Sequence, residues 1–287
     1  MTEPAFTTDF LTTLDAFRRT VRGPANEVPL ARAALLIARA ERPDLDVDEY
    51  ERRLQSVAST LEDRVRGVSS IDARVDAAGT LLFDELGFRN DTEEYAHPRN
   101  LLLDQVIERR VGVPVTLALV YHEICQRAGL DARAVGLPGQ VVARLEVPDG
   151  EPIFIDVAAG GRRLSAEDCR EIVRRIYGRR TAFRDSFLEV ITPRQVLQRL
   201  LHNLKARALQ QGEEERAART IELLLALFPW DLDELRDRGM LHERVGDYPG
   251  ALEDLELYVR YRSAARDADT VAETVRSLRR HVGPSPS

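Results

Sequence analysis

The sequence of 287 residues is poor in several residue types that identify a protein class. Its two cysteines, Cys125 and Cys169, are too few for a disulfide framework and lack the spacing of metal ligands. Lys205 is the single lysine, but an arginine bias spread over the whole chain indicates genomic composition rather than chemistry. We therefore expect neither a metal site nor a cofactor.

Long apolar runs are also missing. Stretches such as Leu223–Phe228 and Val113–Val120 are far shorter than the ~20 residues that a membrane-spanning helix needs. The start, Met1–Pro4, has no basic or apolar region typical of an export signal. The net charge of −7 gives no overall positive field for nucleic acid or anionic membranes. We expect a globular cytoplasmic protein that binds neither.

Residues 1–90 are expected to form a helical region. Good helix formers fill residues 31–40, and apolar residues recur at helical spacing after Asp46. A third helix is expected over residues 71–86. The polar segment 90–100 is expected to be a loop, with Asn100 capping a helix over residues 101–110.

The middle of the chain, residues 91–180, changes character. Residues 112–129 have Pro114 at a first-turn position and Gly129 at the end, which predicts one helix, and its apolar first half predicts burial. Three short runs rich in Val and Ile then predict strands over residues 132–135, 140–147 and 152–158. The fold class is therefore α+β and mostly helical.

The turn between the last two strands predicts their register. Pro148-Asp149-Gly150 suits a three-residue hairpin loop with Gly150 in the left-handed conformation. The paired residue numbers then sum to 298. Gln140 and Asp156 become diagonal neighbours on one face of the sheet, roughly 7–8 Å apart.

The C-terminal part, residues 181–280, contains a repeat. Gly212 and Gly246 are 34 residues apart, as are Ala217 and Ala251, which fits the helix–turn–helix tetratricopeptide pattern. The tail 281–287 is expected to be disordered. Helical repeats expose a concave face that accepts a protein or peptide. Three residues of the first repeat helix could bind such a partner, although a purely solvated face is an alternative: Asn203, Lys205 and Arg207.

A helix whose start meets strands with polar residues on one face is the geometry of a papain-like thiol site. Such a site needs a cysteine at the helix start, a histidine base on one strand and an acid or amide on the next. Here the helix start 112–116 has no cysteine and the first strand offers Gln140. Of the three residues that such a site needs, the sequence therefore supplies only the acid, Asp156.

Several motifs, in order, resemble the SirB-like proteins of bacteria. They are Arg109–Leu117, Gly129-Leu130, Val135–Gly139, and Phe154–Asp156 with Gly160-Gly161, and the likeness spans roughly residues 25–265. The resemblance implies a papain- or transglutaminase-like core, a buried helix with a small antiparallel sheet, followed by tetratricopeptide-type repeats.

The resemblance also implies a degenerate site at Pro114, Thr116, Gln140 and Asp156. The cysteine of active relatives would align near Pro114, Thr116 takes a hydroxyl position, and Gln140 stands where SirB-like proteins usually keep histidine. Because glutamine cannot accept a proton at neutral pH, we expect a non-catalytic adaptor or binding protein. Two alternatives are an acyl-transfer or amide-hydrolysing enzyme built on Thr116, Gln140 and Asp156, and a pocket that binds an acyl or amide ligand without turnover.

Overall fold

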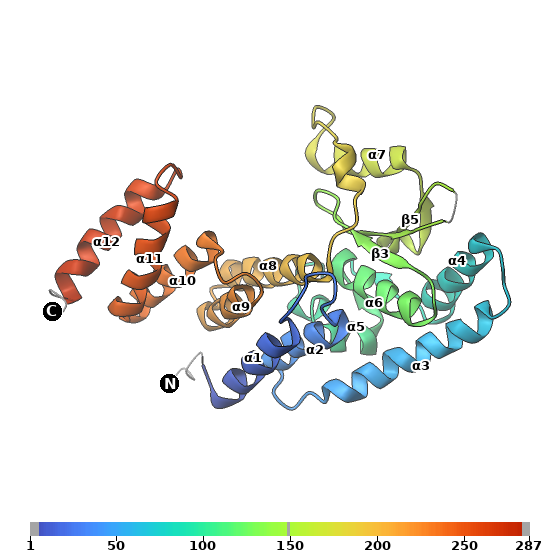
Figure 1. Ribbon diagram of the computed structural model, residues 1–287, viewed down its shortest axis with the longest axis horizontal. Coiled ribbons are helices and arrows are strands. Elements are labelled where there is room, and N and C mark those ends of the chain that lie inside the picture. Colours follow the sequence, from blue (N-terminus) through green and yellow to red (C-terminus); the bar gives the residue numbers. More distant parts are fainter. Residues whose placement is uncertain (1–5, 148–149, 283–287) are drawn as a thin grey trace. The chain divides into compact units, whose positions relative to one another are not determined.

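The computed structural model describes residues 6–147 and 150–282 and divides into two compact units (Figure 1). One unit spans Asp15–Asn203. The other joins the N-terminal residues up to Leu14 to the residues from Leu204 onward. The division falls within two helices, α1 (Thr8–Thr20) and α8 (Pro193–Gln211).

The larger unit begins with the helices that the sequence predicts. They are α2 (Leu30–Glu41), α3 (Val47–Val65) and α4 (Ile71–Gly79), which continues into the π-helical segment η1 (Thr80–Glu85). Asp46 caps α3 by accepting the N–H of Glu49 at 3.1 Å. The apolar stripe of α3, including Tyr50, Leu54 and Leu61, is buried, because residues at this spacing share one helix face.

The central helix α6 (Pro114–Arg127) is buried along its first half, as its apolar sequence predicts. It packs against α2, α3, β3 and β4. A second helix, α7 (Ala166–Tyr177), starts with a capping box formed by Ser165 and Asp168. It covers the opposite side of the sheet through Cys169, Ile172 and Val173, so the sheet lies between α6 and α7 (Figure 1).

The sheet is antiparallel with strand order β3-β4-β5-β6. Its strands are β3 (Ala132–Val135), β4 (Val142–Leu145), β5 (Ile153–Asp156) and β6 (Arg162–Leu164). The predicted register is confirmed, because Ala143 pairs with Ile155 and Leu145 with Ile153. β4 and β5 are shorter than predicted, and β6 was not predicted.

The hairpin turn is only partly described, since residues 148–149 lie outside the described residues. Gly150 donates its N–H to the Val147 carbonyl at 3.1 Å. A separate parallel pair, β1 (Arg89–Asn90) and β2 (Val111–Gly112), joins the loop before α5 (Leu103–Arg109) to the start of α6.

Besides the N-terminal residues up to Leu14, the smaller unit contains the end of α8, then α9 (Glu214–Leu227), α10 (Leu232–Val245), α11 (Tyr248–Tyr261) and α12 (Ala268–Val282). α10 packs on α9, α11 on α10, and α12 on α11. Gly212 and Gly246 follow α8 and α10 with φ of +71° and +82°, a conformation that glycine adopts without strain. Ala217 and Ala251 are fully buried at equivalent places, so the predicted 34-residue repeat is structural. Of the predicted disordered tail 281–287, His281 and Val282 belong to α12, so the prediction is wrong for these two residues, and residues 283–287 lie outside the described residues.

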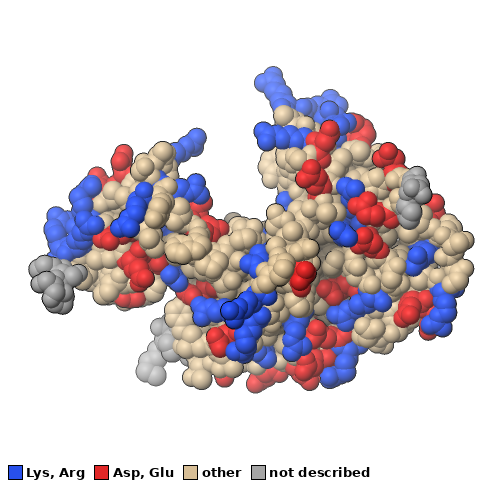
Figure 2. Space-filling view, in the orientation of Figure 1, with Lys and Arg blue, Asp and Glu red and all other residues tan. Residues whose placement is uncertain are grey.

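Charged side chains of both signs are interspersed on the face of the molecule shown in Figure 2. Many form ion pairs between neighbouring side chains, such as Arg64 with Glu85 at 2.7 Å. Exposed pairs of this kind are worth at most about 1 kcal/mol each. Packing therefore stabilises the fold more than surface charge does.

Candidate functional site

A pocket of about 250 Å³ lies where the start of α6, the loop between β3 and β4, and α8 meet. It occupies the place where the sequence analysis put the degenerate site. Its lining residues are Tyr95, Val113, Pro114, Val115, Gly139, Gln140, Val141, Arg199, His202 and Asn203. We call it the α6 pocket.

Gln140 and Asp156 are brought together at this pocket. Gln140 Nε2 donates a hydrogen bond to Asp156 Oδ1 at 3.1 Å. The same oxygen accepts the N–H groups of Ala158 (3.1 Å) and Ala159 (3.2 Å), because Asp156 caps the short 3-10 helix η3 (Val157–Ala159). Asp156 as a whole residue is 5% exposed, and these bonds make its carboxylate a structural cap.

Thr116 has no exposed surface and does not reach the α6 pocket. Its Oγ1 accepts the Val113 N–H at 3.1 Å and lies 2.8 Å from the Asn100 carbonyl, to which it donates. A Cβ on Gly112 would lie 2.7 Å from this Oγ1, so only glycine fits there. The Gly-Val-Pro-Val-Thr motif therefore folds the helix start around a buried hydroxyl.

Asn100 is an anchor for the preceding loop, and the expectation that it caps a helix at residue 101 is wrong. The helix begins at Leu103, with Leu102 at the N-cap position. The buried Asn100 Nδ2 instead donates to Asp91 Oδ2 at 2.9 Å and to the Glu94 carbonyl at 2.8 Å. The loop carries Tyr95 to the rim of the pocket.

Neither cysteine supplies a nucleophile, because both side chains have no exposed surface. Burial raises the pKa of Cys125 to about 12, as expected for a core thiol in the middle of a helix. Burial, followed by the nearby carboxylates of Asp168 and Asp156, raises the pKa of Cys169 to about 11. Both thiols therefore stay protonated at neutral pH.

Two residues of the pocket, Arg199 and His202, come from α8 and were not predicted from the sequence. Arg199 donates to the carbonyls of Leu137 (3.1 Å) and Gly136 (2.9 Å) in the Gly-Leu-Pro-Gly loop. A Cβ on Gly136 would lie 2.9 Å from Arg199 Nη2, so this glycine makes room for the guanidinium. The glycine-rich loop was a detectable signal, but no local pattern identifies its partner 63 residues later.

The three predicted partner-binding residues have different surroundings. Asn203 is exposed and lines the α6 pocket. Lys205 Nζ bonds Glu234 Oε1 at 2.6 Å and Asp237 Oδ2 at 2.9 Å, with a side chain that is 12% exposed. Arg207 is buried. Lys205 and Arg207 therefore do not present donors at the surface, which corrects the expectation for those two.

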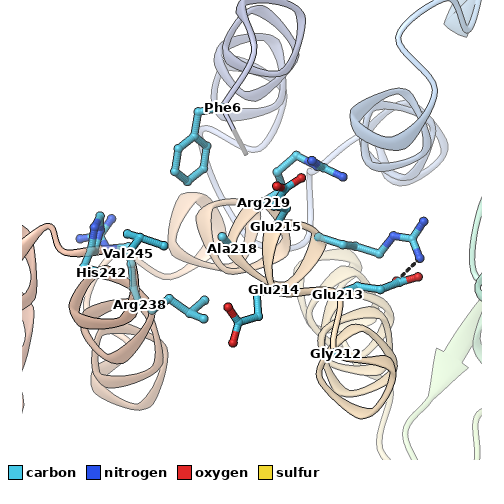
Figure 3. Close-up of a pocket in the computed structure, with 12 residues that line it drawn as sticks. Phe6, Gly212, Glu213, Glu214, Glu215, Ala218, Arg219, Arg238, His242 and Val245 are labelled. Atoms are coloured by element: carbon cyan, nitrogen blue, oxygen red, sulfur yellow. Dashed lines mark hydrogen bonds and ion pairs between the residues drawn. The ribbon is translucent and has the colours of Figure 1, made fainter. Parts of the chain in front are cut away.

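The smaller unit has its own groove of about 800 Å³ between α9 and α10 (Figure 3). Glu213, Glu214 and Glu215 stand at the start of α9, and Glu213 pairs with Arg216. Arg238 and His242 come from α10, and Arg238 is held by Asp254 at 2.7 Å and Glu222 at 2.9 Å. Apolar side chains also line the groove: Phe6, Ala218, Leu241 and Val245. The groove thus combines apolar contact surface with charges of both signs.

Within residues 6–147 and 150–282, no three His, Cys, Asp or Glu side chains are grouped so that they could hold a metal ion. In the same residues, no helix is long and apolar enough to cross a membrane.

Comparison with known proteins identifies both parts of the chain. Residues 48–202 match the transglutaminase-like superfamily, and residues 204–276 match the tetratricopeptide repeat. Among solved structures, menin is similar with a TM-score of 0.41 and 13% identity, over 88% of this chain and 70% of that one. Similarity this weak supports no conclusion about function.

Curated relatives match over most of their length. A UPF0162 protein of Xylella fastidiosa is 36% identical over 85% of this chain and 88% of its own. The UPF0162 protein YchA of Escherichia coli is 28% identical over 82% of this chain and 87% of its own length. The protein SirB1 of Salmonella typhimurium is 26% identical over 82% of this chain and 87% of its own length. The chain therefore belongs to the SirB-like, or UPF0162, family, in which a transglutaminase-like core precedes tetratricopeptide repeats.

Proposed function

We propose that this chain is a non-catalytic binding protein of the cytoplasm, in which a transglutaminase-like core keeps a pocket but not its chemistry. The observation that carries the proposal is the hydrogen bond from Gln140 to Asp156. An amide occupies the position of the base, and its acid partner is engaged in capping a turn.

Acyl transfer through a covalent intermediate needs a nucleophile and a base that activates it. Pro114 stands at the expected nucleophile position and has no reactive group. Thr116 is sequestered by its bonds to Val113 and Asn100. Glutamine holds no proton-accepting group at neutral pH, so Gln140 cannot activate either one.

The repeats provide the second half of the proposal. Tetratricopeptide repeats generally mediate protein–protein interaction, and helical repeats of this kind use an extended surface for it. The groove between α9 and α10 offers exposed apolar side chains, Phe6 at 40% and Val245 at 75%. We assign this groove to a protein or peptide partner, which makes the chain an adaptor.

The groove is tested with Val245→Asp, which adds a charge to it at a side chain that makes few packing contacts. Tyr261→Asp is the matched control, since Tyr261 is 65% exposed and is not a lining residue of the groove. A partner is captured from a lysate of the native host, and its complex with the chain is reconstituted from purified components. This partner should bind wild type and Tyr261→Asp equally. It should bind Val245→Asp at least about tenfold more weakly. Equal binding to all three would remove the groove from the proposal.

One feature favours the alternative of an altered hydrolase or acyl transferase. His202 lines the same pocket as Gln140 and brings an imidazole to it from α8. The discriminating experiment measures hydroxamate formation from a carboxamide peptide and hydroxylamine. We expect wild type, His202→Ala and Asp156→Ala all to match the rate without protein. Turnover by wild type that both substitutions abolish would establish the enzyme instead.

A further inference from the structure

The α6 pocket contains a cation, Arg199, that no acid among the described residues neutralises. Arg199 is half-buried, and the hydrogen bonds that its guanidinium donates within the described residues go to main-chain carbonyls: Leu137 (3.1 Å), Gln140 (3.4 Å) and Gly136 (2.9 Å). Among residues 6–147 and 150–282, no carboxylate forms an ion pair with it. Burial lowers the pKa of Arg199 from its ordinary value, but arginine remains charged at neutral pH.

Two other half-buried arginines of the same unit are paired with carboxylates. Arg127 lies 3.1 Å from a carboxylate oxygen of Glu123, and Arg144 lies 2.9 Å from one of Glu146. Taking a cation partly out of water without an anion costs free energy that an anionic ligand would recover. Arg199 is therefore the group in this pocket that a negatively charged ligand would satisfy.

The other described residues that line the pocket bring no negative charge to it. None of them is acidic, although Asp and Glu outnumber Lys and Arg in the chain by 48 to 41. A neighbouring pocket of about 460 Å³ in the same unit contrasts with it, since its lining includes Glu27, Glu123 and Asp131. The N-terminal end of α6, which favours negative charge, also opens into the α6 pocket.

Asn203 adds amide donors next to the cation. It stands four residues after Arg199 on α8, so the two side chains are neighbours on one face of the helix. Both line the pocket. A guanidinium beside a carboxamide suits the two oxygens of a carboxylate.

The walls favour a carboxylate that ends a peptide. Val113, Val115 and Val141 form an apolar side of the cavity, which has room for one small side chain at about 250 Å³. Beyond Gly139, Ile176 and Tyr177 are 46% and 58% exposed and approach this glycine closely, which extends the apolar surface outward. A free small acid would leave that surface uncovered, whereas the preceding residues of a peptide would cover it.

We propose that the α6 pocket binds the C-terminal carboxylate of a peptide or protein whose last side chain is small and apolar, with Arg199 and Asn203 holding the carboxylate. This inference rests on the proposed function, since it assumes that the pocket binds without turnover. It adds the chemical class of the ligand.

The test uses the full chain and fluorescent peptides that end in Val, Ile or Leu, each made with a free carboxylate and with a terminal carboxamide. Fluorescence anisotropy should show saturable binding of the free-carboxylate peptides and at least about tenfold weaker binding of the carboxamides. Isobutyrate and inorganic phosphate serve as competitors, and neither should displace the peptide at concentrations near its Kd. Equal binding of both peptide forms, or no binding, would overturn the proposal. Displacement by either competitor at such concentrations would show that a free anion, and not a peptide end, is the ligand.

Two variants locate the binding. Asn203→Asp is nearly isosteric and changes an exposed side chain. Because it places a negative charge beside Arg199, it should weaken peptide binding at least about tenfold. Gln210→Glu adds the same charge at an exposed site of α8 outside the pocket lining and should change the Kd by less than about twofold. Equal effects of the two would contradict the assignment. Mass spectrometry of the recovered peptides distinguishes a failure of the proposed binding-only function from a failure of the carboxylate site. Shortened peptides would refute the binding-only function. Peptides that stay intact and show no binding would refute the carboxylate site and leave the binding-only function standing.

Discussion

The buried hydroxyl of Thr116 makes a quantitative prediction. Thr116→Val replaces the hydroxyl by a methyl group of similar size, so the packing around it is kept. The substitution leaves the Val113 N–H and the Asn100 carbonyl without the partner that Oγ1 supplied at 3.1 Å and 2.8 Å. The start of α6 and the end of the 91–100 loop thereby lose their link.

The cost follows from the number of groups left without a partner. A buried polar group without a hydrogen bond costs about 1–3 kcal/mol. Two such groups lower the free energy of unfolding of the larger unit by about 2–4 kcal/mol, since some relaxation is expected. For a unit of this size, the Tm then falls by roughly 5–15 °C.

Thermal and urea unfolding followed by circular dichroism measure this change. Thr116→Ser keeps the hydroxyl and should lose only about 1 kcal/mol, for one methyl group. Thr60→Val is the matched control, because the Thr60 hydroxyl donates to the Ser56 carbonyl (3.1 Å) on the exposed face of α3 and should change stability by less than about 0.5 kcal/mol. A Thr116→Val chain as stable as the control would refute the structural role of this hydroxyl.

Three further predictions concern other buried groups. Cys125 and Cys169 should resist iodoacetamide at pH 8 in the native chain and react in urea, because burial raises their pKa to about 12 and about 11; fast native labelling would contradict this. Lys205→Met should destabilise the smaller unit by about 3–5 kcal/mol in urea titrations, because Glu234 and Asp237 lose their cation, whereas a loss under about 1 kcal/mol would show that the pairing is unimportant. Asp91→Asn should be less stable than wild type at pH 7, because the Glu94 N–H and other donors to the carboxylate hold the pKa of Asp91 below its usual value. That difference is present above about pH 4 and should shrink as the pH falls through the lowered pKa; a constant difference from pH 7 to pH 2 would contradict it.

Local patterns were enough for much of the fold. Pro114 and Gly129 bounded the central helix because both have positional preferences at helix ends. The turn around residues 148–150 predicted a register that Ala143 and Ile155 confirm, because strand pairing follows from the length of the connecting loop. The same register put Gln140 and Asp156 on one face, and their side chains do meet there.

Long-range contacts were beyond the sequence patterns. The 34-residue spacing assigned residues 181–280, which include α8, to the repeats, but it could not show that Arg199 lies against Gly136. Asn100 has a residue type that suits a cap, yet tertiary hydrogen bonds within the loop take its side chain. Lys205 looked like a surface donor, because its partner Glu234 lies 29 residues further along the chain.

Oxygen exchange tests most directly the proposal that this site carries out no acyl chemistry. A site that forms and hydrolyses an acyl intermediate exchanges the oxygens of a bound carboxylate with water, whichever leaving group it evolved to release. The full chain is incubated in oxygen-18-labelled water with a peptide ending in a free carboxylate. The mass of the peptide is then measured by mass spectrometry. A binding-only pocket leaves the peptide mass unchanged beyond the rate without protein. A mass increase that requires the chain and disappears in Asp156→Ala would show that the site is catalytic.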